Sequence, residues 1–502
     1  MKRRLVVFAV VMAVLAVPVA ALSHGPLDTA KVSSSTSATT TEPGTSDNLE
    51  LVGHSSLRAR GMNAAPAIYK NFLYVGSRTD GSAGHENAGV LVVNIDNPRH
   101  PRVVGEIGPP LEGTPSQTSR ELRVWPEKKL LIVMNFRCST LIHACAPGDD
   151  VWDFKFYDLS GSNARHPKLI ATYESSFKPH EMFLWDDPEQ PGRALLYISV
   201  PHNSESPDDD TPNLLVTDIS RARRGVFQEV ATFTANPLYT PEDIETRDVA
   251  LHSMSVSVDG TRTYLAYLGG GFLILDSSEV AAGSQDPRFK LLTPVTNSPA
   301  WPNQTVHTAV KVFGRDLVVT TDEIYGDLLD DFAFEDHGCP WGWAHVIDIA
   351  DEANPELVGE YKIEENTDAY CEGPSGQDPA NTYFTSYAAH NPTVLRRLGI
   401  TTWHSGGLQV FDLADPTAPR QTGFFSPEPL EDVDTEDPAL SQGLNKAVVW
   451  SYPIIRNGLV YVVDVRNGLY VFRYTGPGRS EVDRIDFLEG NSTLGDAARL
   501  ER

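Results

Sequence analysis

Residues 407–419 read GLQVFDLADPTAP, and this short phrase decides the fold. A mainly apolar run ends at Asp412, and a turn containing proline follows, which is typical of a β-strand that ends at the surface. The phrase recurs along the chain with the same order of residue types. Its six other copies are GVLVVNIDNP (89–98), DFKFYDLSGS (153–162), NLLVTDISRA (213–222), GFLILDSSEV (271–280), WAHVIDIADEANP (343–355) and GLYVFRYTG (468–476).

The spacing of the seven copies indicates a repeat architecture. They lie roughly 60 residues apart, and each interval holds about four short apolar strands. A four-stranded unit cannot bury both of its faces alone, so it must stack on its neighbours. Radial stacking gives a β-propeller with seven blades. A β-sandwich or two smaller domains is the competing interpretation, but no linker divides the copies.

The two ends of the repeat region complement each other. Most copies are followed by a strand such as PRVVGEI (101–107) or PELVGEY (355–361), but the seventh copy lacks it. A matching strand occurs far upstream in NLELVGHSSL (48–57). We therefore predict an all-β, seven-bladed β-propeller over residues 48–476, in which the N-terminal strand completes the last blade and closes the ring. Residues 477–502 form a C-terminal extension.

The strand phrase and its L-V-G continuation resemble the repeat of the LVIVD-repeat family. The resemblance covers residues 48–476 and implies a β-propeller that is secreted or exposed at the cell surface. It is specific for architecture and weak for activity, because a fold does not fix a function.

The N-terminus carries a targeting signal. Residues 1–25 read MKRRLVVFAVVMAVLAVPVAALSHG, with a basic start, an apolar run and small residues near Ala21. This pattern predicts a signal peptide over residues 1–21, although a retained anchor is the alternative. Residues 22–47 are rich in Ser and Thr and read as a disordered linker. We expect a secreted or cell-surface protein with no transmembrane segment after cleavage.

The net charge limits the kinds of binding partner, and the cysteine content bears on disulfide formation. The chain has 41 Lys and Arg against 67 Asp and Glu, a formal net charge of −26. Such a surface repels nucleic acid and anionic lipid. The acidic stretches 204–213 and 426–439 read as solvated loops, because no calcium-loop spacing supports ion binding. In an oxidising compartment the four cysteines favour two disulfides. The predicted pairs are Cys138 with Cys145 and Cys339 with Cys371.

Aligning the copies on their first strands brings seven residues into one column. They are Asn63, Arg120, His180, His252, His307, His390 and Trp450. The first strand of a propeller blade lines the central channel, so these residues should meet at one channel mouth. Neutral imidazole suits zinc, copper or iron, so the four histidines of the column are candidate ligands of a transition metal, or part of a site for another ligand. Glu121 and Glu181 are candidate general bases or further ligands. The alternative is that each histidine bonds to the backbone and only holds its blade.

A second group of polar residues follows the second strands and should lie at the same mouth. Antiparallel order places the end of strand two beside the start of strand one. The predicted rim residues are Arg78, His202, Asp322, Glu323, His404 and Asp464.

Three classes of function fit this pattern. The first is a propeller, expected to be monomeric, that binds a metal or another ligand at the histidine-lined mouth, where the ligand is a protein, a glycan or a small molecule. The second is a metal-dependent hydrolase or oxidase that uses the channel histidines. The third is a structural or adhesive protein of the cell envelope. The first is the one we favour.

Overall fold

Each copy of the repeated phrase forms a β-strand in the computed structural model. The structure describes residues 44–502, apart from 83, 85, 115, 139–145, 147–150, 203–208, 325–338, 379–385, 431–432 and 434–446. The predicted signal peptide and most of the predicted linker lie outside these residues. The strands formed by the phrase are β5 (Val90–Asn94), β9 (Trp152–Asp158), β13 (Leu214–Asp218), β17 (Phe272–Asp276), β21 (Ala344–Asp348), β25 (Leu408–Asp412) and β29 (Gly468–Tyr474).

The Asp or Asn that ends the phrase has a local structural role. Asp412 Oδ1 accepts a hydrogen bond from the N–H of Ala414 at 2.7 Å, and Asp348 Oδ1 accepts one from Ala350 at 2.8 Å. This two-residue step is an Asx turn, which ends a strand without a further backbone partner. The same bond is formed by Asn94, Asp158, Asp218 and Asp276. The repeated phrase is therefore a strand with its own stop signal.

Each phrase strand is the third strand of an antiparallel four-stranded unit, and we number these units 1 to 7 in chain order. The other strands are β3 (Asn63–Tyr69), β4 (Phe72–Ser77) and β6 (Arg102–Ile107) in unit 1; β7 (Gln117–Trp125), β8 (Leu130–Arg137) and β10 (Lys168–Tyr173) in unit 2; β11 (Met182–Asp186), β12 (Ala194–Ser199) and β14 (Gln228–Phe233) in unit 3; β15 (Ser253–Val256), β16 (Arg262–Ala266) and β18 (Lys290–Leu291) in unit 4; β19 (Val306–Lys311), β20 (Leu317–Asp322) and β22 (Glu356–Tyr361) in unit 5; β23 (Pro392–Val394), β24 (Leu398–Thr402) and β26 (Arg420–Pro427) in unit 6; and β27 (Ile454–Arg456), β28 (Leu459–Asp464) and β2 (Leu49–Ser55) in unit 7. Units 1 and 2 are joined into one sheet by a single pair, Ser77 with Ser119.

Unit 7 contains strands from both ends of the chain. Strand β2 pairs antiparallel with β29, with Leu49 opposite Tyr474 and Ser55 opposite Leu469. Residues 44–47, at the end of the predicted linker, form β1 (Gly44–Asp47), which pairs with β26 of unit 6. The N-terminal strand therefore occupies the place that the sequence left vacant in the seventh copy.

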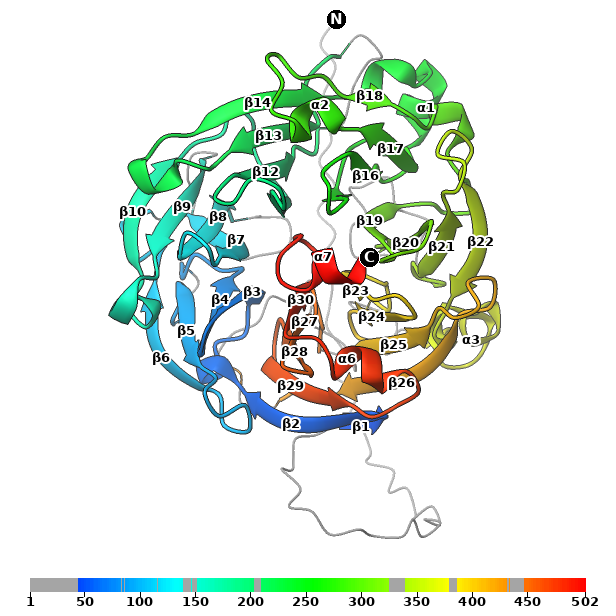
Figure 1. Cartoon of the computed structure of the whole chain (residues 1–502). Helices are drawn as coiled ribbons and strands as arrows, with labels where there is room; N and C mark the ends of the chain where they lie inside the picture. Colours follow the sequence, from blue (N-terminus) through cyan, green and yellow to red (C-terminus); the bar gives the residue numbers. More distant parts are fainter. Residues whose placement is uncertain are drawn as a thin grey trace, which may run out of the picture. The chain divides into compact units, whose positions relative to one another are not determined.

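Neighbouring units share hydrophobic cores. Between units 3 and 4, for example, Trp185 and Tyr197 pack in one buried cluster with Leu265. All the remaining pairs of consecutive units share a comparable cluster, and a further cluster joins unit 7 to unit 1. Figure 1 shows the sheets arranged around a common centre, as in β-propellers. The predicted all-β fold is confirmed.

Helices are few and short in the described part of the chain. The α-helices are α1 (Pro241–Thr246), α2 (Ser278–Ala281), α3 (Asp368–Glu372), α6 (Arg479–Val482) and α7 (Ala497–Leu500). Short 3₁₀ turns are η1 (Leu57–Ala59), η2 (Gly161–Ala164), η3 (Ala222–Arg224), η4 (Asn236–Leu238), η5 (Val295–Asn297) and η7 (Glu364–Asn366). Among the described residues, none of the helices combines the length and the hydrophobicity that crossing a bilayer requires.

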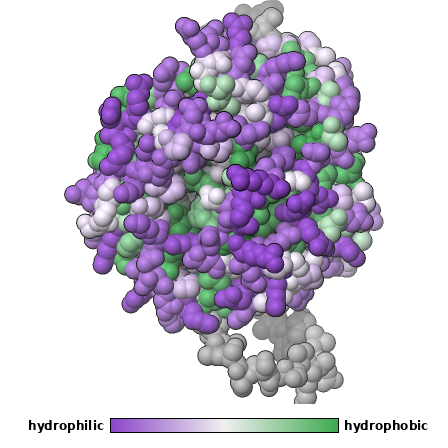
Figure 2. Space-filling model, viewed as in Figure 1, coloured by the Kyte–Doolittle hydropathy of each residue, from purple (hydrophilic) through white to green (hydrophobic). Residues whose placement is uncertain are grey.

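The C-terminal extension lies across the centre of the arrangement of sheets (Figure 1). Strand β30 (Phe487–Glu489) pairs with β27 of unit 7, and Ser492 forms a bridge with Leu184 of unit 3. Near the end of the chain, Glu501 lies 2.7 Å from Lys311 Nζ, at the end of β19 in unit 5. The segment thus contacts three separate units. In the same view, hydrophilic residues cover much of the surface (Figure 2).

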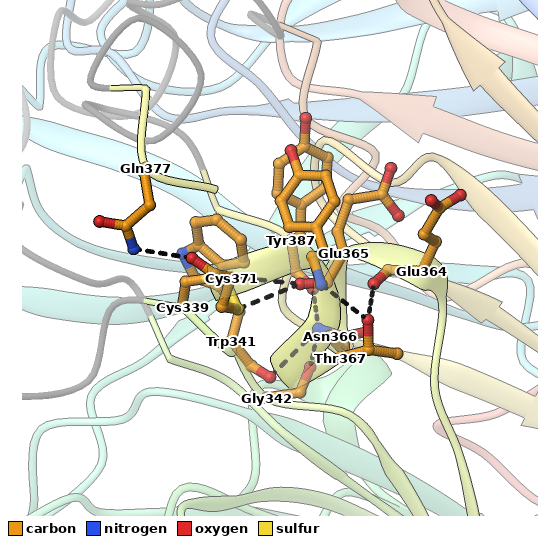
Figure 3. The surroundings of a disulfide bond; sticks show 11 residues. Cys339, Trp341, Gly342, Glu364, Glu365, Asn366, Thr367, Cys371, Gln377 and Tyr387 are labelled. Carbon is orange, nitrogen blue, oxygen red and sulfur yellow. Dashed lines mark hydrogen bonds between the residues drawn. A yellow bond between two sulfur atoms is a disulfide. The ribbon is translucent and has the colours of Figure 1, made fainter. Parts of the chain in front are cut away.

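A disulfide joins Cys339, which lies before β21, to Cys371 in α3, with 5.5 Å between the Cα atoms (Figure 3). Nearby, the Asn366 side chain donates hydrogen bonds to the carbonyl oxygens of Trp341 and Tyr387, which ties the same loops together. The predicted Cys339–Cys371 bond is confirmed. Cys138 is also disulfide-bonded, and its predicted partner Cys145 lies outside the described residues.

The glycine of the L-V-G strand explains how one unit fits against the next. A Cβ atom at Gly359 of unit 5 would lie far inside van der Waals contact of the Pro416 carbonyl oxygen of unit 6. A Cβ at Gly53, in the N-terminal strand of unit 7, would meet the Pro98 carbonyl of unit 1 in the same way. Only glycine lets these backbones approach so closely. The Gly of one copy and the Pro turn of the next therefore form one recurring contact.

This contact yields a matched pair of variants. Gly359→Ala should lower the free energy of unfolding by about 1–3 kcal/mol, because backbone must move to admit the methyl group. Gly105→Ala, at the equivalent position of unit 1, should be tolerated, since its nearest neighbour would be 3.7 Å away. Urea unfolding of both variants measures the difference. Equal stability of the two would contradict the proposed packing.

Candidate functional site

The four histidines of the aligned column lie at or just before the first strand of their units. His307 is the second residue of β19, and His252 directly precedes β15. The backbone N–H of His180, His252 and His390 donates to the carbonyl of Ser199, Ala266 and Thr402, at the end of the second strand or just beside it. These ladder bonds fix where each imidazole leaves the backbone.

The imidazole rings form a continuous row. The ring centroids of His180 and His252 are 4.4 Å apart, those of His252 and His307 3.9 Å, and those of His307 and His390 4.3 Å. His404, which follows β24, continues the row at 5.0 Å from His390. We call these five residues the histidine row. The structure brings all four predicted metal ligands together, with one predicted rim residue added.

Trp450 and Arg78 end the row on the unit 7 side. The Trp450 ring is stacked on His404, with 5.0 Å between centroids and an angle of 5°. The Arg78 guanidinium lies 4.1 Å above the same indole, a cation–π contact. Both residues were predicted from the sequence. They cap the row with an aromatic face and a positive charge.

Glu323 contacts more rings of the histidine row than any other carboxylate of the described residues. It follows β20, is 9% exposed, and places its carboxylate against three rings of the row. Oε2 is 3.3 Å from His307 Nε2, while Oε1 is 3.3 Å from His390 Nε2 and 3.1 Å from His404 Nε2. The sequence marked Glu323 only as one rim residue among several, because nothing in VVTTDE distinguishes it from the neighbouring Asp322.

The outer nitrogens of these three rings are held by the protein. His390 Nδ1 lies 2.7 Å from the Trp450 carbonyl oxygen, which can only accept a hydrogen bond, so Nδ1 carries a proton. His307 Nδ1 lies 2.6 Å from Thr308 Oγ1, and His404 Nδ1 lies 2.9 Å from Ser386 Oγ. Contacts of this type fix the tautomer and the ring orientation of metal-binding histidines. Sequence reasoning missed Thr308 and Ser386, because common hydroxyl residues carry no pattern.

The electrostatics lower the pKa of several rings of the row and also that of the central carboxylate. Burial lowers the pKa of His252 to about 4, and it lowers that of His404 to about 4 although Glu323 opposes the shift. Burial disfavours ionisation of Glu323, but the interactions with His307 and His390 outweigh it and hold its pKa well below the ordinary value. Imidazole and carboxylate groups together are a donor set that suits a transition-metal cation.

The backbone of His404 is in the left-handed region, with φ of +36°. Non-glycine residues rarely adopt this conformation, and such strain concentrates at functional sites. The turn is fixed by hydrogen bonds from the N–H of Trp403 to Gly407 and from the N–H of Gly406 to Trp403. The chain therefore maintains a strained turn that presents an imidazole to Glu323.

Glu121 and Glu181, the candidate bases, belong to a second buried group. Glu121 pairs with Arg123 at 3.0 Å, and the same guanidinium donates to the Met182 carbonyl. Burial raises the pKa of Glu121, and burial together with Glu121 raises the pKa of Glu181 well above the ordinary value. Glu489 of the C-terminal segment is likewise buried, with its pKa raised by burial. Arg120, the column residue of unit 2, lies 5.1 Å from the Phe136 ring.

The remaining predicted rim residues have other partners. Asn63 accepts a hydrogen bond from Arg60 at 2.7 Å. His202 Nε2 lies 2.6 Å from the Asp209 carboxylate. Asp322 accepts a hydrogen bond from Trp301 at 2.6 Å. Asp464 accepts the N–H groups of Arg466 and Asn467, closing the turn after β28.

The buried nitrogen and oxygen atoms form two sets suited to a metal ion. One set is His252, His307 and Glu323, and the other is Glu323, His390 and His404. Within each set, the potential ligand atoms all lie within 4.8 Å of one another. The arrangement brings imidazole and carboxylate donors together in a largely buried setting.

Comparison with known proteins gives fold likeness only. No protein-family model and no curated protein matches the chain. Among solved structures, it is similar to Sqt1 from Chaetomium thermophilum, with 11% identity, 85% of this chain and 99% of Sqt1 covered, and a TM-score of 0.47. It is also similar to Sqt1 from Saccharomyces cerevisiae, with 8% identity, 84% and 98% coverage, and a TM-score of 0.47. Likeness at this level assigns no function.

Asp464 gives a pH-dependent prediction. Burial raises its pKa to about 7, against an ordinary value of 3.8. The unfolded chain ionises first as the pH rises, so wild-type stability should fall between pH 4 and pH 8. Asp464→Asn keeps the acceptor for the turn and cannot ionise. Relative to this variant, the wild type should lose on the order of 4 kcal/mol of unfolding free energy over that interval.

Urea titrations of both proteins at the two pH values measure this difference. A stability difference that does not change with pH would contradict the protonated, buried state of Asp464.

Proposed function

We propose that this protein is an extracytoplasmic, LVIVD-type, seven-bladed β-propeller that binds a transition metal ion at the histidine row. The three parts of this proposal rest on different observations. The hydrophobic cores shared between units support the number of blades. The disulfide supports the location, and the surroundings of Glu323 support metal binding.

The closed ring of seven blades is supported by contacts between the first and last units. Tyr461 and Val471 of unit 7 are buried in one cluster with Leu73 and Leu91 of unit 1. Gly53 meets the Pro98 carbonyl as Gly359 meets that of Pro416, so this junction repeats a contact made inside the array. Strand β2 serves as the outer strand of the seventh blade.

Metal binding is supported by a single observation above all. The Glu323 carboxylate lies 3.1–3.3 Å from the Nε2 atoms of His307, His390 and His404. Two ligands at 2.0–2.1 Å from one tetrahedral ion are about 3.3 Å apart, so Glu323 and each of these rings have the spacing of two ligands of the same cation. Zinc, copper and iron all accept this mixture of imidazole and carboxylate donors.

The alternative, that the histidines only hold the blades together, is not exclusive. His390 does link unit 6 to unit 7 through the Trp450 carbonyl. That bond uses Nδ1, so the other ring nitrogen, Nε2, is the one directed at Glu323. A ring nitrogen and a carboxylate oxygen 3.3 Å apart need a proton or a cation between them.

Metal-dependent catalysis is the second candidate function, and one feature favours it. Glu181 follows His180 directly, and burial together with the neighbouring Glu121 raises its pKa well above the ordinary value. Buried acids of this kind serve as general acids in hydrolases. A reaction at the metal would therefore have a proton donor beside the row.

The disulfide supports the proposed location. Cys339 and Cys371 are bonded, and structural disulfides persist in oxidising compartments. If residues 1–21 direct export, fusion of residues 1–47 to a reporter that folds only outside the cytoplasm should give activity. Deleting residues 2–21 should abolish that activity. An active reporter without these residues would contradict the proposal.

The metal proposal predicts both content and stability. The full chain, purified without a histidine tag, should contain zinc, copper or iron by elemental analysis. Zn²⁺ added to chelator-treated protein should raise the unfolding free energy by about 2.7 kcal/mol at a free concentration of 100 Kd. Glu323→Gln should lose most of this stabilisation, because it removes the charge that both ligand sets share.

His202→Asn is the matched control, since this imidazole pairs with Asp209 away from the row. It should keep the wild-type metal content. Protein that neither contains nor is stabilised by any of these metals would refute the metal proposal and leave the histidines with a packing role.

A further inference from the structure

We infer that the histidine row holds two metal ions, bridged by the carboxylate of Glu323. This inference rests on the proposed metal binding and specifies its stoichiometry and geometry. It begins with the way the two carboxylate oxygens of Glu323 face different rings. Oε2 faces His307, while Oε1 faces His390 and His404.

The two ligand sets are distinct. His252 and His307 form one set with Glu323, and His390 and His404 form the other. Among the described residues, the ligand atoms of the five residues do not fall within 4.8 Å of one another as a single group. Ligands of one ion at 2.0–2.1 Å can be at most about 4.2 Å apart. One ion therefore cannot bind both sets without moving the rings.

A carboxylate that binds through both oxygens joins ions about 3.5–4 Å apart, the usual spacing of two-metal sites. In the histidine row, Oε2 of Glu323 faces His307 while Oε1 faces His390 and His404, so each oxygen is directed at a different ligand set. The same carboxylate supplies one oxygen to each ion. The geometry thus suits one ion on the unit 4 and 5 side and one on the unit 6 side.

The two positions differ in their surroundings. The first set has His180 beside it, with Nε2 2.8 Å from His252 Nε2. The second set lies under Trp450, which packs 4.2 Å from His390 and stacks on His404. The Arg78 guanidinium lies 4.1 Å from the centroid of the same indole and acts electrostatically on His404. An ion at the second position would therefore have a positive charge nearby, which suits an anionic ligand or substrate at its remaining coordination position.

The test is a metal count on matched variants. Chelator-treated full chain is equilibrated with Zn²⁺, dialysed and analysed for zinc per chain. The wild type should bind two ions. His307→Asn and His404→Asn should each bind one, and Glu323→Gln fewer than one. Asn is chosen at position 404 because it tolerates the left-handed backbone there. His202→Asn should still bind two.

A second measurement separates bridged ions from independent ones. In the wild type loaded with Cu²⁺, the electron paramagnetic resonance spectrum should show a magnetically coupled, carboxylate-bridged pair of ions. In His307→Asn or His404→Asn it should show the spectrum of a single uncoupled Cu²⁺ ion. Circular dichroism confirms that each variant is folded. If either variant unfolds, His252→Asn or His390→Asn replaces it in the same set.

The outcomes separate the two proposals. Two ions with coupling support the dinuclear centre. One ion in the wild type overturns it and leaves the proposed metal binding intact. Two uncoupled ions, or two ions that survive in Glu323→Gln, also overturn it. No bound ion overturns both.

Discussion

The antiparallel pairing of Leu49–Ser55 with Gly468–Tyr474 is the interaction on which the rest of the structure depends. It supplies the outer strand of the last unit and brings that unit against the first through a shared core. Without it, both terminal units would expose a hydrophobic face and an unpaired strand edge, which repeat proteins avoid. The histidine row depends on the same arrangement, because its members come from units 3 to 6 and meet only when the units surround one centre.

The site combines four histidines at equivalent positions of the repeat with one residue, Glu323, that has no equivalent in the other units. His180, His252, His307 and His390 occupy the same place in successive units, so a regular scaffold is enough to align them. Glu323 breaks this regularity, since it lies at the end of a second strand in a single unit. One carboxylate among several imidazole rings gives the cluster its charge asymmetry.

The sequence predicted the all-β architecture well because six of the seven strand phrases end in their own stop signal, and the strand after several of them carries a packing glycine. The Asx turn at Asp412 and the close approach at Gly359 are local features, and local features can be recognised in a string of residues. The column of histidines was found for the same reason. The role of Glu323 was not, because it depends on how far a loop turns back toward the centre. Asn63 and Asp464 lie near the predicted positions, yet they satisfy backbone groups.

The C-terminal segment has a consequence for how the molecule is made. Residues 487–501 contact units 3, 5 and 7, so they cannot dock before those units exist. The N-terminal strand must likewise wait for β29, the last phrase strand to be synthesised. Individual units have neighbours to fold against during synthesis, but assembly ends only once the whole polypeptide is available.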